Sequence, residues 1–138
     1  MIKKVFIDSD VILDVATGRT PFVKDSQRVL SIIETGKATG LISANSVTNI
    51  YYILSKISTP EKSVLFIKNI LKFISVISID HDGVLKAIDS KFTDFEDGVQ
   101  NYCALKNQCD FIVTRNIKDY KFSELTVLEP KEFLLLFN

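Results

Sequence analysis

Three short segments of this sequence carry carboxylate, hydroxyl and amide side chains beside apolar runs. They are Asp8-Ser9-Asp10, Asp94-Phe95-Glu96-Asp97 and Thr114-Arg115-Asn116. Carboxylates gathered from separate segments repel one another unless a cation lies between them, and Mg²⁺ or Mn²⁺ takes such oxygen ligands. A cation held in this way can activate water and stabilise charge on a phosphodiester under attack. The residue types therefore predict metal-assisted cleavage of a phosphodiester.

Asp8 is the leading candidate ligand, because it ends an apolar run, residues 5–7, that is predicted to be a buried strand. A buried carboxylate is costly unless it meets a cation or hydrogen-bond donors. The alternative role for Asp8 is to cap a helix that begins near Val11, although Ser9 or Asp10 could take that position. We expect Asp8 to be a metal ligand and a catalytic residue.

Asp94 and Asp97 lie three residues apart at a predicted helix start, so both can point to one side of its first turn. The alternative is capping, with Asp94 as the N-cap and with Glu96 and Asp97 stabilised by the helix dipole. Capping and metal binding are compatible for different members of the cluster. We expect Asp94 and Asp97 to join Asp8 in the catalytic and metal-binding set.

Short apolar runs rich in β-branched residues alternate with longer helical patterns. The predicted strands are residues 5–7, 41–42, 76–79, 111–113 and 126–128. The predicted helices start near Val11, follow Pro21, cover 47–54, start at Pro60, cover 84–88 and 94–107, and start at Pro130. The inward residues of the Pro60 helix are predicted to be Val64, Ile67, Leu71 and Ile74.

Continuous rather than alternating apolarity suits strands that are covered on both faces. Strands that alternate with helices predict a three-layer α/β/α sandwich, with a mostly parallel sheet of four or five strands and the strand before Asp8 at its centre. Ligands bind outside the carboxyl ends of such strands, so the polar segments are expected to converge on one edge of the sheet.

The 138 residues are expected to form a single domain over 1–138. Seventeen basic residues balance seventeen acidic ones, so a nucleic acid would have to bind through a local basic patch. The spacing of Cys103 and Cys109 suits neither a redox motif nor a zinc site, and two reduced thiols are expected. No apolar stretch approaches the length of a membrane span, which favours a cytoplasmic protein without a membrane partner.

Four segments, taken in order, resemble those of PIN domains. Residues 6–14 resemble the opening of these proteins, with a strand, an acid, a small hydroxyl residue and then Asn or Asp. Residues 94–98 resemble their later acidic helix start, and residues 111–116 resemble a strand that commonly ends Thr-Arg-Asp. Residues 46–54 stand where PIN domains carry a helix with a catalytic Glu. The resemblance spans essentially the whole chain.

The resemblance implies a PIN-like fold and a ribonuclease that depends on Mg²⁺ or Mn²⁺ and acts on RNA. Bacterial and archaeal members of this size are often toxins of type II toxin–antitoxin pairs, the VapC-like group, which implies an antitoxin partner and a homodimer. Carried over by position, it implies that Asp8 and Asp97 are metal ligands and that Asp94 is an auxiliary acid. Ser9 and Thr114 are expected to support them, Thr114 by a hydrogen bond to a carboxylate; the alternative role for Thr114 is to cap the strand.

Two positions depart from the pattern, because Asn49 stands where the family usually has Glu and Asn116 where it usually has Asp. An Asn can ligate Mg²⁺ through its carbonyl oxygen but brings no charge, so weaker metal binding is expected. Glu96 and Asp119 are candidates to compensate. The two departures favour an alternative, a catalytically impaired PIN-like binding module in which Asn49 and Asn116 play supporting roles.

Two further interpretations concern the surroundings of the cluster. Arg115, Lys118 and Lys121 are expected to contact RNA phosphates, with a solvated basic loop as the alternative. Residues 5–11 also fit the opening of haloacid-dehalogenase phosphatases, in which Asp8 would be the nucleophile and Asp10 the acid/base. That family needs a downstream Lys and an acidic pair after a strand, for which only Asp80 and Asp82 are candidates, so it is the less favoured enzyme.

Overall fold

The apolar runs form five parallel strands in the computed structural model, which describes residues 1–137. They are β1 (Lys3–Ile7), β2 (Ala38–Ser43), β3 (Ile74–Ile77), β4 (Phe111–Val113) and β5 (Thr126–Leu128). The order across the sheet is β3-β2-β1-β4-β5, and each neighbouring pair is parallel. The predicted parallel sheet is confirmed, with the strand before Asp8 at its centre.

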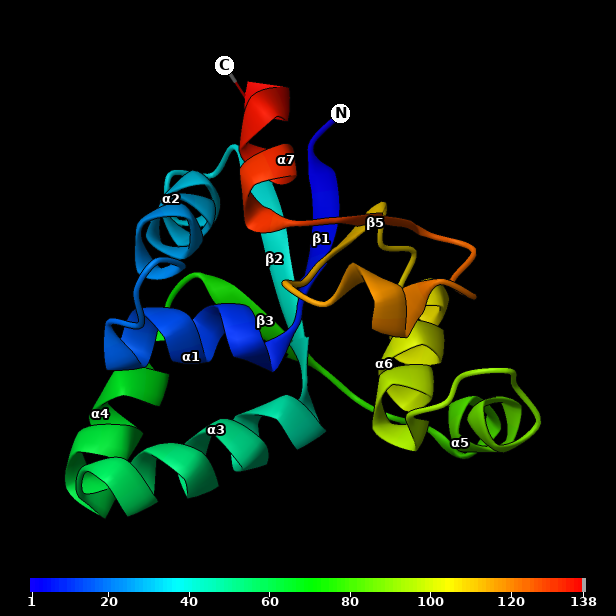
Figure 1. The fold of residues 1–138 in the computed structure, drawn as a ribbon, viewed down its shortest axis with the longest axis horizontal. Helices are drawn as coiled ribbons and strands as arrows, with labels where there is room; N and C mark the ends of the chain where they lie inside the picture. The colour runs from blue at the N-terminus through cyan, green and yellow to red at the C-terminus, as the bar shows by residue number, and fades with distance from the viewer. Residues whose placement is uncertain (138) are drawn as a thin grey trace.

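Helices cover both faces of this sheet (Figure 1). They are α1 (Ser9–Thr17), α2 (Val23–Glu34), α3 (Ala44–Ile57), α4 (Pro60–Ile70), α5 (His81–Ile88), α6 (Phe95–Lys106) and α7 (Pro130–Leu134), with the 3-10 helices η1 (Ile117–Tyr120) and η2 (Leu135–Phe137). In Figure 1, α5 and α6 lie on one side of the strands and the helices α1, α2, α3, α4 and α7 on the other. The three-layer sandwich is thereby confirmed. Over residues 1–137, no helix combines the length and apolarity that a membrane crossing requires.

The central strand shows why its sequence is apolar at consecutive positions. Val5 and Ile7 are fully buried in the larger core, which they share with residues of α1, α2, α3 and α7. Phe6 points to the other face and packs in a smaller core with Ile112 and Tyr120. Because helices cover both faces of the sheet, consecutive residues at the end of β1 are all buried.

Several helices begin at side chains that satisfy their first free N–H groups. Ser43 accepts a hydrogen bond from the backbone of Ser46 at the start of α3, and Thr59 does the same for α4, whose first residue is Pro60. Asp80 caps α5 through the backbone N–H of Gly83. These caps fix where each of the three helices begins.

The segment after Pro60 differs from the prediction. The helix ends at Ile70, whereas Ile74 was predicted on its inner face; Ile74 opens β3, where it pairs with Gly40 and is buried. The strand predicted at 76–79 therefore lies two residues earlier. Val64 and Leu71, which were predicted to face inward, are exposed. Pairing with β2 leaves Ile74 buried, and this tertiary contact overrides the helical period.

The two cysteines are free thiols, as predicted. Cys103 and Cys109 are both buried, and burial raises the pKa of each thiol to about 11. A thiol that stays protonated at neutral pH is a poor nucleophile and a poor metal ligand. The chemistry of this protein therefore has to be sought among its oxygen-bearing side chains.

A close approach of α2 to the sheet gives a first testable prediction. An added Cβ at Gly40 would lie 2.8 Å from Cγ2 and 3.0 Å from Cδ1 of Ile33 on α2. Forcing an extra methyl group into such a contact costs about 1–3 kcal/mol. We expect Gly40→Ala to lower the free energy of unfolding by this amount in urea denaturation. Thr39→Ala, at an exposed position of the same strand, is the control. Equal loss in both variants would contradict the predicted close packing.

Candidate active site

The carboxyl ends of β1 and β4 lie side by side and bring Asp8 against Thr114. The backbone N–H of Asp8 donates to the carbonyl of Val113 at 2.9 Å, which continues the pairing of the two strands. The hydroxyl of Thr114 donates to Asp8 Oδ2 at 2.9 Å. Asp8 is only 8% exposed. The strand edge therefore fixes the position of this carboxylate, and Thr114 lies where a supporting residue was expected.

Asp8 occupies the N-cap position of α1, but its side chain makes no capping hydrogen bond. The carboxylate instead accepts from Thr114 and from the hydroxyl of Tyr120. Burial raises the pKa of Asp8, against the effect of the hydrogen bonds from Thr114, the local backbone and Tyr120. The capping alternative therefore does not explain why a carboxylate is buried at this strand end.

Asp97 approaches Asp8 from the first turn of α6. One oxygen, the hydroxyl of Tyr120, lies 3.3 Å from Asp8 Oδ2 and 3.4 Å from Asp97 Oδ1. Burial, followed by the charges of Asp8, Asp94 and Asp119, raises the pKa of Asp97 to about 7. Burial and the neighbouring carboxylates also raise the pKa of Tyr120, so its hydroxyl keeps its proton. The expected convergence of Asp8 and Asp97 on one sheet edge is seen.

Asp10 is a third carboxylate at this edge, and the expected site did not include it. Its Oδ2 accepts from the side-chain amide of Asn116 at 3.0 Å and from the backbone N–H of Arg115 at 3.4 Å. Its Oδ1 is buried and has no hydrogen-bond partner in the described part of the chain. Burial and then the charge of Asp8 raise the pKa of Asp10 to about 7. Its place three residues after the end of the strand was the available sequence signal.

Other expected site residues lie around these three acids without the same contacts. Asp94 caps α6, because its Oδ1 accepts from the backbone N–H of Asp97 at 3.0 Å, so the capping alternative describes what this residue does here. Ser9 is buried at the first position of α1. Asn49 is half-buried on α3. Over residues 1–137, neither the Ser9 nor the Asn49 side chain makes a hydrogen bond to the acidic cluster.

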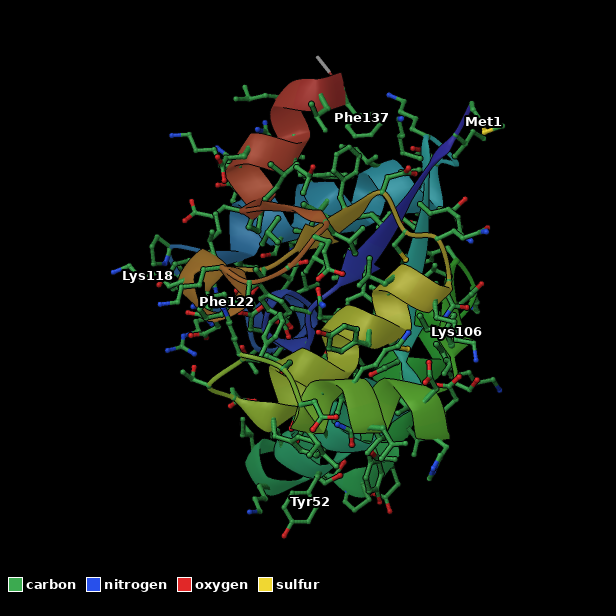
Figure 2. All side chains as sticks on the ribbon, turned by 90° about the vertical axis from the view of Figure 1, so that its right-hand side faces the viewer. Met1, Tyr52, Lys106, Lys118, Phe122 and Phe137 are labelled. Carbon is green, nitrogen blue, oxygen red and sulfur yellow. The ribbon has the colours of Figure 1, made fainter. Side chains whose placement is uncertain are left out.

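Arg115 forms an ion pair that the sequence did not reveal. Its Nε lies 2.6 Å from Asp14 Oδ2 and its Nη2 lies 3.2 Å from Asp14 Oδ1, and the guanidinium stacks 4.1 Å from the ring centre of Phe22. Asp14 is 1% exposed. Such a buried bidentate pair holds the loop after β4 against α1. A phosphate contact by Arg115 would have to compete with Asp14, whereas Lys118 is exposed on η1 and extends outward in Figure 2.

The carboxylate oxygens of the cluster fit a hard divalent cation, for which the protein supplies only part of the coordination shell. Among the residues that the structure describes, no group of three or more His, Cys, Asp or Glu side chains is arranged to hold a metal ion. Asp8 and Asp97 nevertheless share one hydroxyl neighbour, and Asp10 Oδ1 is a buried oxygen without a hydrogen-bond partner among residues 1–137. Mg²⁺ is commonly bound by one or two carboxylates and completes its shell with water and substrate phosphate. The residues present fit that arrangement.

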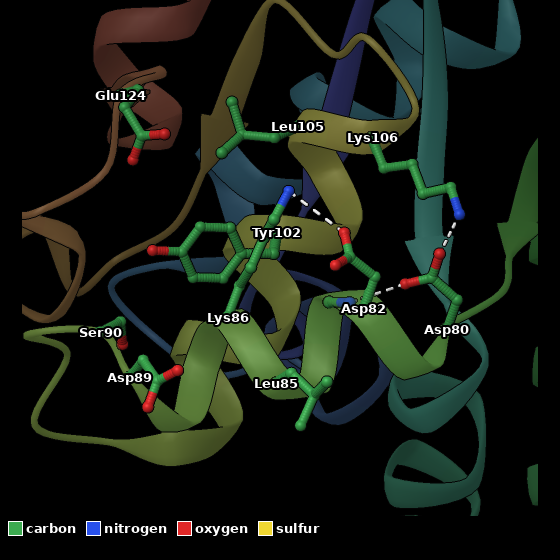
Figure 3. A pocket seen from close by; sticks show the side chains of 11 residues that line it. Asp80, Asp82, Leu85, Lys86, Asp89, Ser90, Tyr102, Leu105, Lys106 and Glu124 are labelled. Atoms are coloured by element: carbon green, nitrogen blue, oxygen red, sulfur yellow. Dashed lines mark hydrogen bonds and ion pairs between the residues drawn. The ribbon is translucent and has the colours of Figure 1, made fainter.

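A cavity of about 760 Å³ lies away from this cluster, between α5 and α6 (Figure 3). Its charges are mostly paired, Lys106 with Asp80 and Lys86 with Asp82. Asp80 follows β3, which β2 separates from β1. Asp80 and Asp82 therefore do not join the acids after β1, and the second acidic segment that the phosphatase alternative requires is missing from the site.

Comparison with known proteins finds similar sequences and similar folds. A family model described as PIN domain matches residues 4–118. Ribonuclease VapC1 of Aquifex aeolicus (strain VF5) is 33% identical over 141 residues, which cover 99% of this chain and 96% of the relative. Among solved structures, VapBC2 from Rickettsia felis bound to a promoter DNA fragment has a TM-score of 0.71 at 15% identity, covering 91% of this chain and 97% of that one. A toxin–antitoxin complex from Klebsiella pneumoniae has a TM-score of 0.70 at 16% identity, with the same coverage.

The raised pKa values of the cluster predict a pH-dependent stability of the metal-free protein. The pKa of Asp97 is about 7 in the folded chain against 3.8 as its ordinary value, so the folded state binds the proton more tightly. The stabilisation from this proton is fully present below about pH 4 and is lost as the pH rises through 7. We expect the melting temperature in EDTA to contain a component that falls between about pH 4 and 7. Asp97→Asn should flatten that fall, and an unchanged profile in the variant would contradict the assignment.

Proposed function

This chain belongs to the PIN-domain family, and on that premise we propose that it is a divalent-metal-dependent endoribonuclease whose active site is the acidic cluster around Asp8 and Asp97. The observation that carries the proposal is the approach of these two carboxylates, from β1 and α6, to a single hydroxyl oxygen. Two carboxylates confined together favour a cation between them. Their place beyond the carboxyl ends of β1 and β4 is where parallel sheets bind ligands.

Each residue of the cluster has a definite part in this proposal. Asp8 and Asp97 would hold Mg²⁺ or Mn²⁺, and Thr114 orients Asp8 through its 2.9 Å hydrogen bond. When bound, the cation supplies charge stabilisation to the phosphodiester and lowers the pKa of a coordinated water. Asp94 caps α6 and so places Asp97 on the first turn. Lys118 and Lys121, both exposed beside the cluster, would contact RNA phosphates.

Asp10 supplies a carboxylate beside position 116, one of the two positions that depart from the family pattern. Position 116 lacks the usual carboxylate, but the Asn116 amide donates to Asp10 Oδ2, so a carboxylate charge stands within hydrogen-bond distance of that position. We include Asp10 in the active site as its third acid, held by Asn116 and by the backbone of Arg115. This charge favours an active enzyme over the impaired binding module, although the carboxylate that position 49 lacks is not replaced in the same way.

The family and the surface support the partners that we propose. Relatives with this fold have been solved as toxin–antitoxin complexes, which supports a role for this chain as the toxin of such a pair with a protein antitoxin. A homodimer is supported by an apolar cavity of about 490 Å³ on α3 and α4. Exposed Tyr51, Val64 and Leu71 contribute to it. An exposed apolar face of this kind is a common site of protein association.

The proposed function is tested by cleavage of a mixed RNA pool by the purified chain. Wild type should cleave with Mn²⁺ or Mg²⁺ and stop when EDTA is added. Asp8→Asn should lose at least about 100-fold in rate, since losing a direct ligand should cost no less than the 10–100-fold typical of outer-shell residues. Asp89→Asn, an exposed carboxylate after α5, is the matched control and should cleave like wild type. Cleavage that ignores EDTA, or equal rates for Asp8→Asn and wild type, would favour the impaired binding module.

Exchanging the acid and the amide tests the role of Asp10. Asp10→Asn removes the third charge and should lower metal-dependent cleavage about 10-fold or more. Asn116→Asp alone places a second carboxylate 3.0 Å from Asp10 Oδ2 and should lower the melting temperature without added metal. The double variant Asp10→Asn with Asn116→Asp restores one charge and one amide, and should recover most of the cleavage. If the double variant is as inactive as Asp10→Asn, the charge has to be at position 10 itself.

A further inference from the structure

Tyr120 is a buried side chain whose only polar atom faces the two principal acids. The residue ends η1 and is 1% exposed, the largest of the fully buried side chains. Its ring packs in the smaller core with Phe6 and Ile112, and edge-on against Phe92 with ring centres 6.1 Å apart. A ring held on these sides has little freedom, so the position of its hydroxyl is fixed by the core and not by the acids.

The hydroxyl is placed between oxygens that come from distant parts of the chain. Asp8 Oδ2 is 3.3 Å away and Asp97 Oδ1 is 3.4 Å away. Both distances exceed the usual value of about 2.7–2.8 Å, as expected for a hydroxyl shared by two acceptors. These carboxylates are its hydrogen-bond partners in the described chain. Burying a hydroxyl is costly without such partners, and a phenylalanine would fill the same space without that cost.

One hydroxyl has one proton, so it donates to one carboxylate at a time. The contact links Asp8 and Asp97 but leaves most of their negative charge uncompensated. It also engages a single oxygen of each carboxylate, and Asp97 Oδ2 makes no hydrogen bond over residues 1–137. The arrangement orients two carboxylates while keeping oxygen atoms available for a further positive partner.

We propose that Tyr120 is a positioning residue, whose hydroxyl holds Asp8 and Asp97 at the separation and orientation in which they bind one divalent cation. The inference rests on the proposed function, because it assigns to Tyr120 a role in the metal affinity of the same site. The sequence offers no acid or amide at this position, and neither the strand-end pattern nor the family resemblance singled it out. Its link to the site exists only in three dimensions, through η1.

The test compares two Tyr→Phe substitutions that remove one hydroxyl each. Tyr120→Phe keeps the ring in the core and removes the contact to both carboxylates. Tyr102→Phe is the matched control, because that ring also packs against Phe92, at 6.4 Å, while its hydroxyl lies in the cavity between α5 and α6 (Figure 3). Mn²⁺ affinity is measured by titration calorimetry, and the rise in melting temperature on adding Mn²⁺ is measured within each variant. A variant that is only less stable is therefore distinguished from one that binds Mn²⁺ more weakly.

We expect Tyr120→Phe to bind Mn²⁺ about 10–100-fold more weakly than wild type, the usual effect of losing a residue that orients a ligand. Tyr102→Phe should match wild type. At saturating Mn²⁺ the cleavage rate of Tyr120→Phe should return to near the wild-type rate, because the hydroxyl does not touch the reacting atoms. In an Asp8→Asn background, Tyr120→Phe should add little to the loss of the Mn²⁺-induced shift, since both changes act on the same contact.

A measurement on the unaltered protein covers the case in which Tyr120→Phe folds poorly. In the wild-type chain, the ring-carbon resonance next to the Tyr120 hydroxyl should move on addition of Mg²⁺, while that of Tyr102 stays in place. An unchanged Tyr120 resonance, or a Tyr120→Phe variant with wild-type affinity for Mn²⁺, would overturn the inference and leave the proposed function standing. If wild type itself neither binds Mn²⁺ nor cleaves RNA, the proposed function fails first.

Discussion

Carboxylates are confined at one edge of the sheet, and this confinement governs the chemistry of the site. Asp8, Asp10 and Asp97 are drawn out of water and toward one another, and burial is the main reason that the pKa of each is raised. Such an arrangement costs stability unless donors or cations compensate it. The surrounding hydroxyl and amide donors compensate only in part, which makes the cluster receptive to a divalent cation.

The fold makes this confinement possible through the position of β1. With β2 and β4 on either side and helices on both faces, the end of β1 is buried from every direction except along the strand. Asp8, the residue that follows β1, therefore lies at the carboxyl edge of the sheet. The same edge receives the loop after β4, and the pair between Arg115 and Asp14 ties that loop to α1. The scaffold thus fixes the positions of Asp8 and Asp10 before any ligand is present.

The parts of the site that follow from strand ends could be predicted from sequence. Asp8 and Thr114 come directly after apolar strands, and register alone places them together. The position of Asp97 at this edge could also be predicted. Asp97 lies in the first turn of α6, and the start of a helix that leads into β4 lies near the carboxyl ends of the strands. The contacts of Tyr120 with the acids and of Arg115 with Asp14 could not be predicted. They depend on how a loop and a 3-10 helix fold back over the sheet edge, and no periodic sequence pattern encodes that path. Ile74 was misassigned because pairing with β2 outweighed a helical repeat that looked continuous.

We propose that Asp8 and Asp97 bind one divalent cation between them. The most direct test is an anomalous difference map from crystals of the wild-type chain soaked in Mn²⁺. We expect a peak between the two side chains, with a carboxylate oxygen of each at about 2.0–2.3 Å, the coordination distance expected of a small divalent cation. A map with no peak there, or with its only peak among the carboxylates between α5 and α6, would contradict it.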